Sequence, residues 1–309
     1  MDETDLAICR TLLENSRTPY SELGKTLGLT PQAVHRRVRG LFDAGIIKGT
    51  VTRLTPSALG CMWVMVYGWS KCPSLEDAVS RLAESKSVVV MMMASGNYVY
   101  VHGMVKDATE LATFVSYVQS AACLQDAQVG IVHTPPPAPA NAISSIDLRL
   151  IAALEKNSRK PISQIATEIE VTAKTARRRL NRMLKEGLIQ FSINWQPDTL
   201  GDTVTNLHLA MRGGAEKEKV AVLLVKRLAA NVVRTFSFGN LPSQIIVTLW
   251  TKNVRDMQRI CLELEESGLF SSVVPNIIRG VRYYDEHQAR AFGGTLKPSR
   301  RPLKGHDSG

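Results

Sequence analysis

The chain has 309 residues, of which 44% are hydrophobic and 21% charged, a composition typical of a soluble globular protein with two or more domains. Its formal net charge of +10 favours an acidic partner such as nucleic acid or an anionic membrane surface. No apolar stretch approaches the roughly 20 residues of a membrane helix, and the acidic start Met1–Asp5 is not what a signal peptide requires. The five cysteines form neither a CxxC pair nor a metal-ligand spacing, so we expect a cytoplasmic protein with reduced cysteines and no metal.

The chain repeats itself at an offset of about 142 residues. Asn15-Ser16-Arg17 recurs as Asn157-Ser158-Arg159, and Arg36-Arg37 recurs as Arg178-Arg179. A nearly constant offset over more than 100 residues indicates a tandem duplication. Four prolines within residues 135–139 predict an extended spacer between the two halves.

Each half is predicted to begin with three helices and a β-hairpin, the layout of a winged helix-turn-helix. The third helix of the first half follows Thr30, which suits an N-cap, and ends at Gly45. Glu170 stands where the first turn has Gly28, so a slightly different turn is expected there. The predicted helices are 5–13, 20–27 and 31–44, with two short strands in 46–54 around Gly49; their counterparts are helices near 145–155, 162–169 and 173–186 and a wing at 188–195.

After each of these units the pattern predicts a strand–helix–strand–strand–helix–strand order, which is typical of a ferredoxin-like domain. The first set is Met62–Trp69, Ser74–Lys86, Val88–Ala94, Tyr98–Val105, Asp107–Ala121 and Gln128–Val132. The second set is Thr203–Met211, Glu216–Ala230, Val232–Phe238, Gln244–Trp250, Val254–Ser267 and Val273–Ile278.

The predicted fold class is therefore α+β, with two winged helix-turn-helix domains alternating with two ferredoxin-like (βαββαβ) sensor domains. The predicted domains are 1–60 and 143–202 for the winged helix-turn-helix units, 61–134 and 203–284 for the sensor domains, 135–142 for the proline-rich linker and 285–309 for a flexible basic tail.

The third helix of each half carries an apolar stripe opposite a basic face. A helix fits the major groove, where Arg or Lys bonds guanine and Gln bonds adenine, while other arginines neutralise phosphates. The predicted contacts to double-stranded DNA are Gln32, His35, Arg36, Arg37 and Arg39 in the first half, and Lys174, Thr175, Arg177, Arg178 and Asn181 in the second. Because the two sets differ, we expect them to read two different half-sites.

These stretches resemble the Lrp/AsnC (feast/famine) family of prokaryotic regulators over nearly all of residues 3–284. The resemblance rests on runs such as Ser21-Glu22-Leu23-Gly24, Val34-His35-Arg36-Arg37-Val38 and Gly187-Leu188-Ile189. It implies a transcriptional regulator that is not an enzyme and has no cofactor or catalytic residues. It also implies sensor domains that pair, here as an internal pseudo-dimer, with a homodimer or a higher assembly of such units.

In the same family the sensor domains often bind a small-molecule effector such as an amino acid. We place the effector site at the two Gly-Asn turns, with Gly96, Asn97, Tyr98, Gly239 and Asn240 as its residues.

The main alternative is an enzyme similar to the siroheme decarboxylases, which resemble this family in both domains. Such a site needs histidine and arginine around a pocket for an acidic tetrapyrrole, and the candidates are His102, His133, His208 and Arg234. Lone histidines in strands are more often structural, and such enzymes have no need of arginine-rich recognition helices. No P-loop, GxSxG or HExxH motif is present. A purely architectural chromatin protein is a third alternative, which would coat the genome rather than bind at a few promoters.

Overall fold

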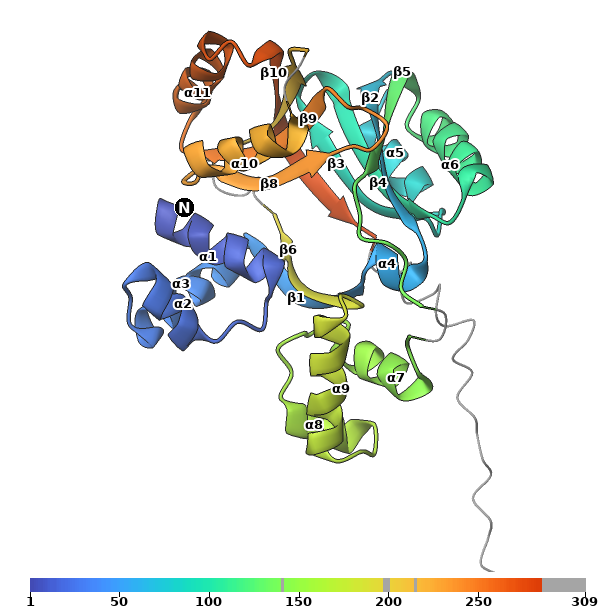
Figure 1. Ribbon diagram of the computed structural model, residues 1–309, viewed down its shortest axis with the longest axis vertical. Coiled ribbons are helices and arrows are strands. Elements are labelled where there is room, and N and C mark those ends of the chain that lie inside the picture. Colours follow the sequence, from blue (N-terminus) through green and yellow to red (C-terminus); the bar gives the residue numbers. More distant parts are fainter. Residues whose placement is uncertain (140–141, 197–200, 214–215, 285–309) are drawn as a thin grey trace, which may run out of the picture.

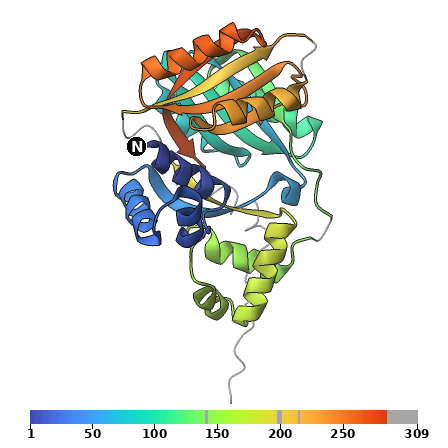
Figure 2. The same cartoon turned by 60° about the vertical axis from the view of Figure 1, so that its left-hand side comes forward.

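The computed structural model describes residues 1–139, 142–196, 201–213 and 216–284. Two groups of three helices lie on one side of an eight-stranded sheet, and a two-stranded ribbon connects them (Figures 1 and 2). The first repeat consists of α1 (Glu3–Glu14), α2 (Tyr20–Leu27), α3 (Pro31–Asp43), β1 (Ile47–Leu54), α4 (Pro56–Leu59), β2 (Met62–Ser70), α5 (Leu75–Leu82), β3 (Val88–Ala94), the 3-10 turn η1 (Ser95–Asn97), β4 (Tyr98–Val105), α6 (Ala108–Ala121) and β5 (Leu124–Val132). The second consists of α7 (Ser145–Leu154), α8 (Ile162–Glu168), α9 (Ala173–Lys185), β6 (Ile189–Trp195), β7 (Thr203–Met211), α10 (Lys217–Arg227), β8 (Val232–Ser237), β9 (Gln244–Thr251), α11 (Val254–Glu266) and β10 (Phe270–Tyr283).

The order of elements agrees with the α+β prediction in both repeats. Strands β3, β4 and β7 begin and end at the predicted residues, whereas β5 and β10 are longer than predicted and α4 was not predicted. All five cysteines are free thiols. Within the described residues no helix is both long and apolar enough to cross a bilayer. The predicted tail, residues 285–309, lies outside the described part of the chain.

Local sequence signals place α3 and α9 in the same way. The Thr30 hydroxyl accepts a hydrogen bond from the Ala33 amide at 3.2 Å, and the Thr172 hydroxyl accepts one from the Thr175 amide at 3.1 Å. Both threonines therefore satisfy an otherwise unpaired amide of the first helical turn. The apolar stripe of each helix is buried, and it consists of Val34, Val38 and Leu41 in α3 and of Ala176, Leu180 and Met183 in α9.

The prediction of a β-hairpin wing inside each half is wrong. Residues Ile47–Leu54 form one strand, β1, and it pairs antiparallel with β6 of the other repeat, with Val51 opposite Ser192. The error has a physical cause, since Gly49 marks an irregularity in the pairing and not a hairpin turn. The wing is thus a ribbon that the two repeats build together.

The repeated Asn-Ser-Arg motif forms the joint between the two helix-turn-helix units. The hydroxyls of Ser16 and Ser158 lie 2.5 Å apart, and both residues are fully buried. Arg17 donates to the Ser158 and Lys160 carbonyls, and Arg159 donates to the carbonyls of Ser16 and Thr18. Each arginine thus reaches across to the other copy of its own motif, which is the pattern of a local two-fold axis.

The two ferredoxin-like units share one sheet with the strand order β5-β2-β4-β3-β10-β7-β9-β8. The units join where β10 pairs antiparallel with β3, and Val281 lies opposite Met92 there. At the outer edges β5 meets β8 through a bridge between Val132 and Phe238, and the Gly239 amide donates to the Ile131 carbonyl at 2.8 Å. The two sensor units therefore contact each other along both edges.

Alternation along the strands separates the sheet into two faces. One face packs against the helices and forms a core in each unit, around Val64 and Phe114 in the first and around Leu207 and Ile260 in the second. The other face packs aromatic side chains into a further core, in which Tyr67, Tyr100 and Phe238 are all fully buried. This core is continuous with that of the first helix-turn-helix unit.

Glu170 does not change the turn before α9, contrary to the prediction. Its backbone has φ +54°, close to the +66° of Gly28. A left-handed conformation is unfavourable for a residue with a Cβ.

We therefore expect Glu170→Gly to raise the free energy of unfolding by about 1 kcal/mol, because it relieves this strain. Gly28→Ala is the matched control and should lower it by a similar amount, since an added Cβ there would meet nothing within 4 Å and only the backbone conformation would matter. Urea denaturation of both variants measures the difference. An unchanged midpoint for Glu170→Gly would contradict the strain argument.

Candidate functional site

Helices α3 and α9 present their predicted DNA-contacting side chains to solvent. The ten predicted residues lie on the outer face or at its edge. The exposed ones are Gln32, His35, Arg36, Arg39, Lys174, Arg177, Arg178 and Asn181, while Thr175 is half-buried beside the N-cap of α9. These side chains make few contacts within the described residues. Arg39 has a long, exposed ion pair with Asp43 at 3.9 Å, and the His35 ring lies 5.7 Å from that of Tyr20.

Arg37 lies at the edge of this face and already has partners within the protein. Its guanidinium forms ion pairs of 2.8 Å with both Asp2 and Asp5 of the α1 cap. The hydrogen bonds that Arg37 donates to Asp5 and then to Asp2 raise its pKa. Arg37 therefore holds α1 against α3 through Nη1.

The second repeat has the same clamp in a more buried form. The carboxylate of Asp147, on α7, is fully buried and forms ion pairs with Arg179 at 3.2 Å and with Arg182 at 2.8 Å. Burial alone would raise the pKa of Asp147, but hydrogen bonds from Ser144, followed by a hydrogen bond from Arg179 and the charge of Arg182, hold it below the ordinary value of 3.8. Arg182 also donates to the Ala142 carbonyl at 3.0 Å, which ties the start of the second repeat to α9.

The Gly-Asn turns that were predicted to bind an effector lie at the seams between the two repeats. Asn240 donates to the Val129 carbonyl and accepts from the Ile131 amide, both at 2.7 Å, so its side chain holds β5 of the other repeat. Asn97 has φ +56°, and η1 lies against β10. Tyr98 is buried against the ring of Trp69 at 4.9 Å. The contacts of these turns are those of a structural seam.

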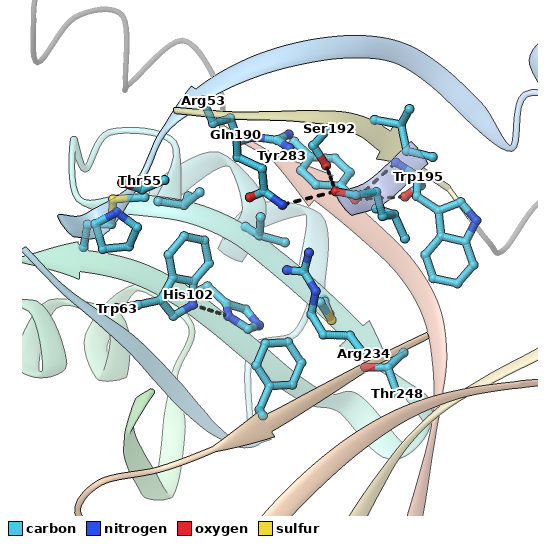
Figure 3. Close-up of a pocket in the computed structure, with 18 of the residues that line it drawn as sticks. Arg53, Thr55, Trp63, His102, Gln190, Ser192, Trp195, Arg234, Thr248 and Tyr283 are labelled. Carbon is cyan, nitrogen blue, oxygen red and sulfur yellow. Dashed lines mark hydrogen bonds between the residues drawn. The ribbon is translucent and has the colours of Figure 1, made fainter. Parts of the chain in front are cut away.

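The candidates for the enzymatic alternative are only partly brought together. His102 and Arg234 line one pocket between the β1/β6 ribbon and the inner face of the sheet (Figure 3). His133 and His208 do not line it. His208 instead bonds the Tyr100 hydroxyl at 2.7 Å, and burial lowers its pKa to about 4. Sequence reasoning missed the wing residues of this pocket, because only the pairing of β1 with β6 brings them there.

The fold and the exposed basic helices define a helix-turn-helix protein, and comparison with known proteins gives the family. Residues 1–41 match the model of the AsnC-type helix-turn-helix domain, and residues 143–190 match that of a winged helix-turn-helix DNA-binding domain. The chain is 32% identical over 118 residues to the transcriptional regulator LrpA of Pyrococcus horikoshii, which covers 38% of this chain and 84% of LrpA. It is 32% identical over 101 residues to the regulatory protein AsnC of Haemophilus influenzae, covering 32% of this chain and 67% of AsnC. The chain belongs to the Lrp/AsnC family.

One solved structure is similar to both repeats at once. The siroheme decarboxylase NirDL superposes with a TM-score of 0.58 over 95% of this chain and 98% of its own. The sequence identity is 12%, so the likeness concerns the fold alone. The fold of the two repeats together, and not only that of a single repeat, is therefore found in another protein.

The Asp147 clamp gives a pH prediction. Asp147→Asn should lower the free energy of unfolding by about 2 kcal/mol at pH 7, because it removes the charge that two arginines share. The carboxyl of Asp147 has a lowered pKa in the folded state, so its stabilisation is complete above the ordinary value of 3.8 and is lost as the pH falls through the folded value. The gap between variant and wild type should thus be constant from pH 7 to 5 and shrink below 3.8. Asp43→Asn, whose side chain is 72% exposed, is the control and should change little. Urea denaturation across this pH range measures the gap.

Proposed function

We propose that the protein is a sequence-specific transcriptional regulator that reads the major groove of double-stranded DNA with α3 and α9. The observation that carries the proposal is the duplicated basic face: both helices bury an apolar stripe and expose arginines and amides to solvent. Side chains of this kind bond base edges and phosphates. Membership of the Lrp/AsnC family, whose similar members are named as transcriptional regulators, supports the same conclusion.

The proposed contacts are the predicted set without Arg37. The reading residues are Gln32, His35, Arg36 and Arg39 in one helix and Lys174, Thr175, Arg177, Arg178 and Asn181 in the other. Arg37 is left out because two carboxylates already occupy its guanidinium.

The joint between the units suits DNA recognition. The Ser16–Ser158 contact and the crossed arginines are buried or half-buried, so α3 and α9 are held at one relative orientation. A fixed orientation sets the spacing of two half-sites on the duplex. We also propose that two such chains assemble into a homodimer or a larger oligomer, each covering one asymmetric unit of the operator.

The second candidate function is that of a siroheme decarboxylase. It is favoured by the likeness to NirDL and by the placement of His102 and Arg234 in one pocket. The size of the pocket argues against it, since its volume of about 120 Å³ is below that of the cavity of about 150 Å³ that holds a single benzene ring. When the purified protein is incubated with siroheme, the absorption spectrum of the pigment should stay unchanged. The number of carboxylate groups on the pigment should stay unchanged as well.

Arg36→Ala and Arg178→Ala should each weaken specific DNA binding by about 1–3 kcal/mol if the arginine reads a base. If it binds a phosphate instead, the salt slope of binding should fall by about 1. The control is Arg255→Ala, which removes the same charge. Arg255 is an exposed residue of α11, on the far side of the sheet (Figure 1). Titration of labelled operator DNA at several salt concentrations measures both quantities. Wild-type binding by both variants would remove the assignment of α3 and α9 as recognition helices.

Selection of bound sequences from a random DNA pool should yield two different half-sites. Gln32 in α3 should favour adenine where Lys174 in α9 favours guanine, because the amide and the ammonium bond different base edges. Each mismatched pair costs about 1–3 kcal/mol, which selection readily detects. A short perfect palindrome would mean that only one of the two helices reads bases.

A further inference from the structure

The pocket of about 120 Å³ joins parts of the molecule that are far apart in sequence (Figure 3). The ribbon strands β1 and β6 form one wall, with Arg53, Gln190 and Trp195 among its residues. The inner face of the sheet forms the other wall, with Trp63, His102 and Arg234. Both repeats and both sheets are therefore needed to enclose it.

His102 offers a hydrogen-bond donor whose position is fixed. The indole N–H of Trp63 donates to Nδ1 of His102 at 3.0 Å. An indole nitrogen can only donate, so Nδ1 is the acceptor and the proton of the neutral ring lies on Nε2. The His102 side chain is 98% buried, its Nε2 has no partner among the described residues, and burial lowers its pKa to about 3. A buried N–H without an acceptor is unfavourable, so this atom lacks a partner that should come from elsewhere.

Arg234 supplies a cation in the same pocket. Its side chain lines the pocket and is accessible to solvent. In the described part of the chain it has neither an ion pair nor a hydrogen bond, and no aspartate or glutamate lines the pocket, although the charge of Glu14 acts on it at longer range. Arg53 differs, because it bonds the Asn194 side chain and lies over the ring of Tyr283 at 5.2 Å. Among the described residues, Arg234 is thus the lining arginine whose guanidinium makes no direct ion pair or hydrogen bond.

The rest of the lining is largely apolar and aromatic. The rings of Trp63 and Phe236 lie beside His102, and Val90, Met92 and Ile193 complete the apolar part. An apolar cavity of about 150 Å³ holds one benzene ring, so this pocket of about 120 Å³ suits a smaller apolar body.

We propose that this pocket binds a small organic carboxylate whose apolar body is smaller than a benzene ring, with Arg234 and the Nε2–H of His102 holding the carboxylate. A guanidinium and a neutral N–H together offer donors to the oxygens of one carboxylate. The apolar lining covers the body of the ligand. The site differs from the Gly-Asn turns predicted from the sequence, and it does not include any proposed DNA contact.

The test uses the full chain, isobutyrate as the probe and isothermal titration calorimetry. Isobutyramide has the same shape without the charge, and inorganic phosphate has charge without the apolar body. Isobutyrate should bind with one site per chain, and isobutyramide and phosphate should each bind at least tenfold more weakly, since a lost charged hydrogen bond or a lost apolar body each exceeds the 1.4 kcal/mol of a tenfold change.

Arg234→Gln should weaken isobutyrate binding at least tenfold, while Arg279→Gln, at an exposed arginine on β10 outside the pocket, should not. His102→Gln should weaken it too, and near-ultraviolet circular dichroism checks that this variant is folded. Arg234→Gln should keep wild-type affinity for DNA, so that a failure of this site is distinguishable from a failure of the proposed regulator function. Equal binding of isobutyrate and isobutyramide, binding that persists in Arg234→Gln, or no isobutyrate binding at all would overturn the proposal.

Discussion

Ser16 and Ser158 meet at the centre of the helix-turn-helix pair, and much of the molecule is organised around that contact. Two copies of one tripeptide face each other there, and each arginine bonds carbonyl groups of the opposite copy. The backbone amides of the two serines bond the carbonyls of Phe191 and Thr50, which belong to the two strands of the ribbon. The same few residues therefore fix the two helical units to each other and to the wing. Because all these polar groups are satisfied inside the joint, it can be buried at little cost.

The ribbon makes the two helix-turn-helix units interdependent. Strand β1 begins in the core of its own unit at Ile47 and ends in the core of the other unit at Leu54. Strand β6 does the same in the opposite direction, from Phe191 to Trp195. Neither unit can complete its core without a strand of the other. This exchange, together with the β3–β10 pairing above it, makes one chain equivalent to a closed dimer.

The two repeats depart from exact symmetry at their seams and in the pocket. The β3–β10 seam is a continuous ladder, whereas its symmetry-related counterpart beside β5 and β8 is a single bridge supported by Asn240. The pocket is likewise asymmetric, because its His102 comes from the first repeat and its Arg234 from the second. After a duplication the two copies are free to diverge, so one chain can carry two different recognition helices and one asymmetric pocket. A dimer of identical chains would carry each feature twice.

From the sequence alone one could predict the duplication, the order of the elements, the two basic helices and most of their exposed residues. Those features depend on short-range signals, namely helical periodicity, the caps at Thr30 and Thr172 and alternation along strands such as β4. Three further features became visible in the folded chain: the wing is shared between repeats, Arg37 is engaged by α1, and Trp63, His102 and Arg234 enclose a pocket with the ribbon. A strand carries no local mark of its partner, because either edge can pair with any compatible strand, and a surface arginine carries no local mark of the carboxylate that it meets. Contacts between residues more than 100 positions apart depend on how the two repeats close around their axis, and that closure is a property of the whole chain.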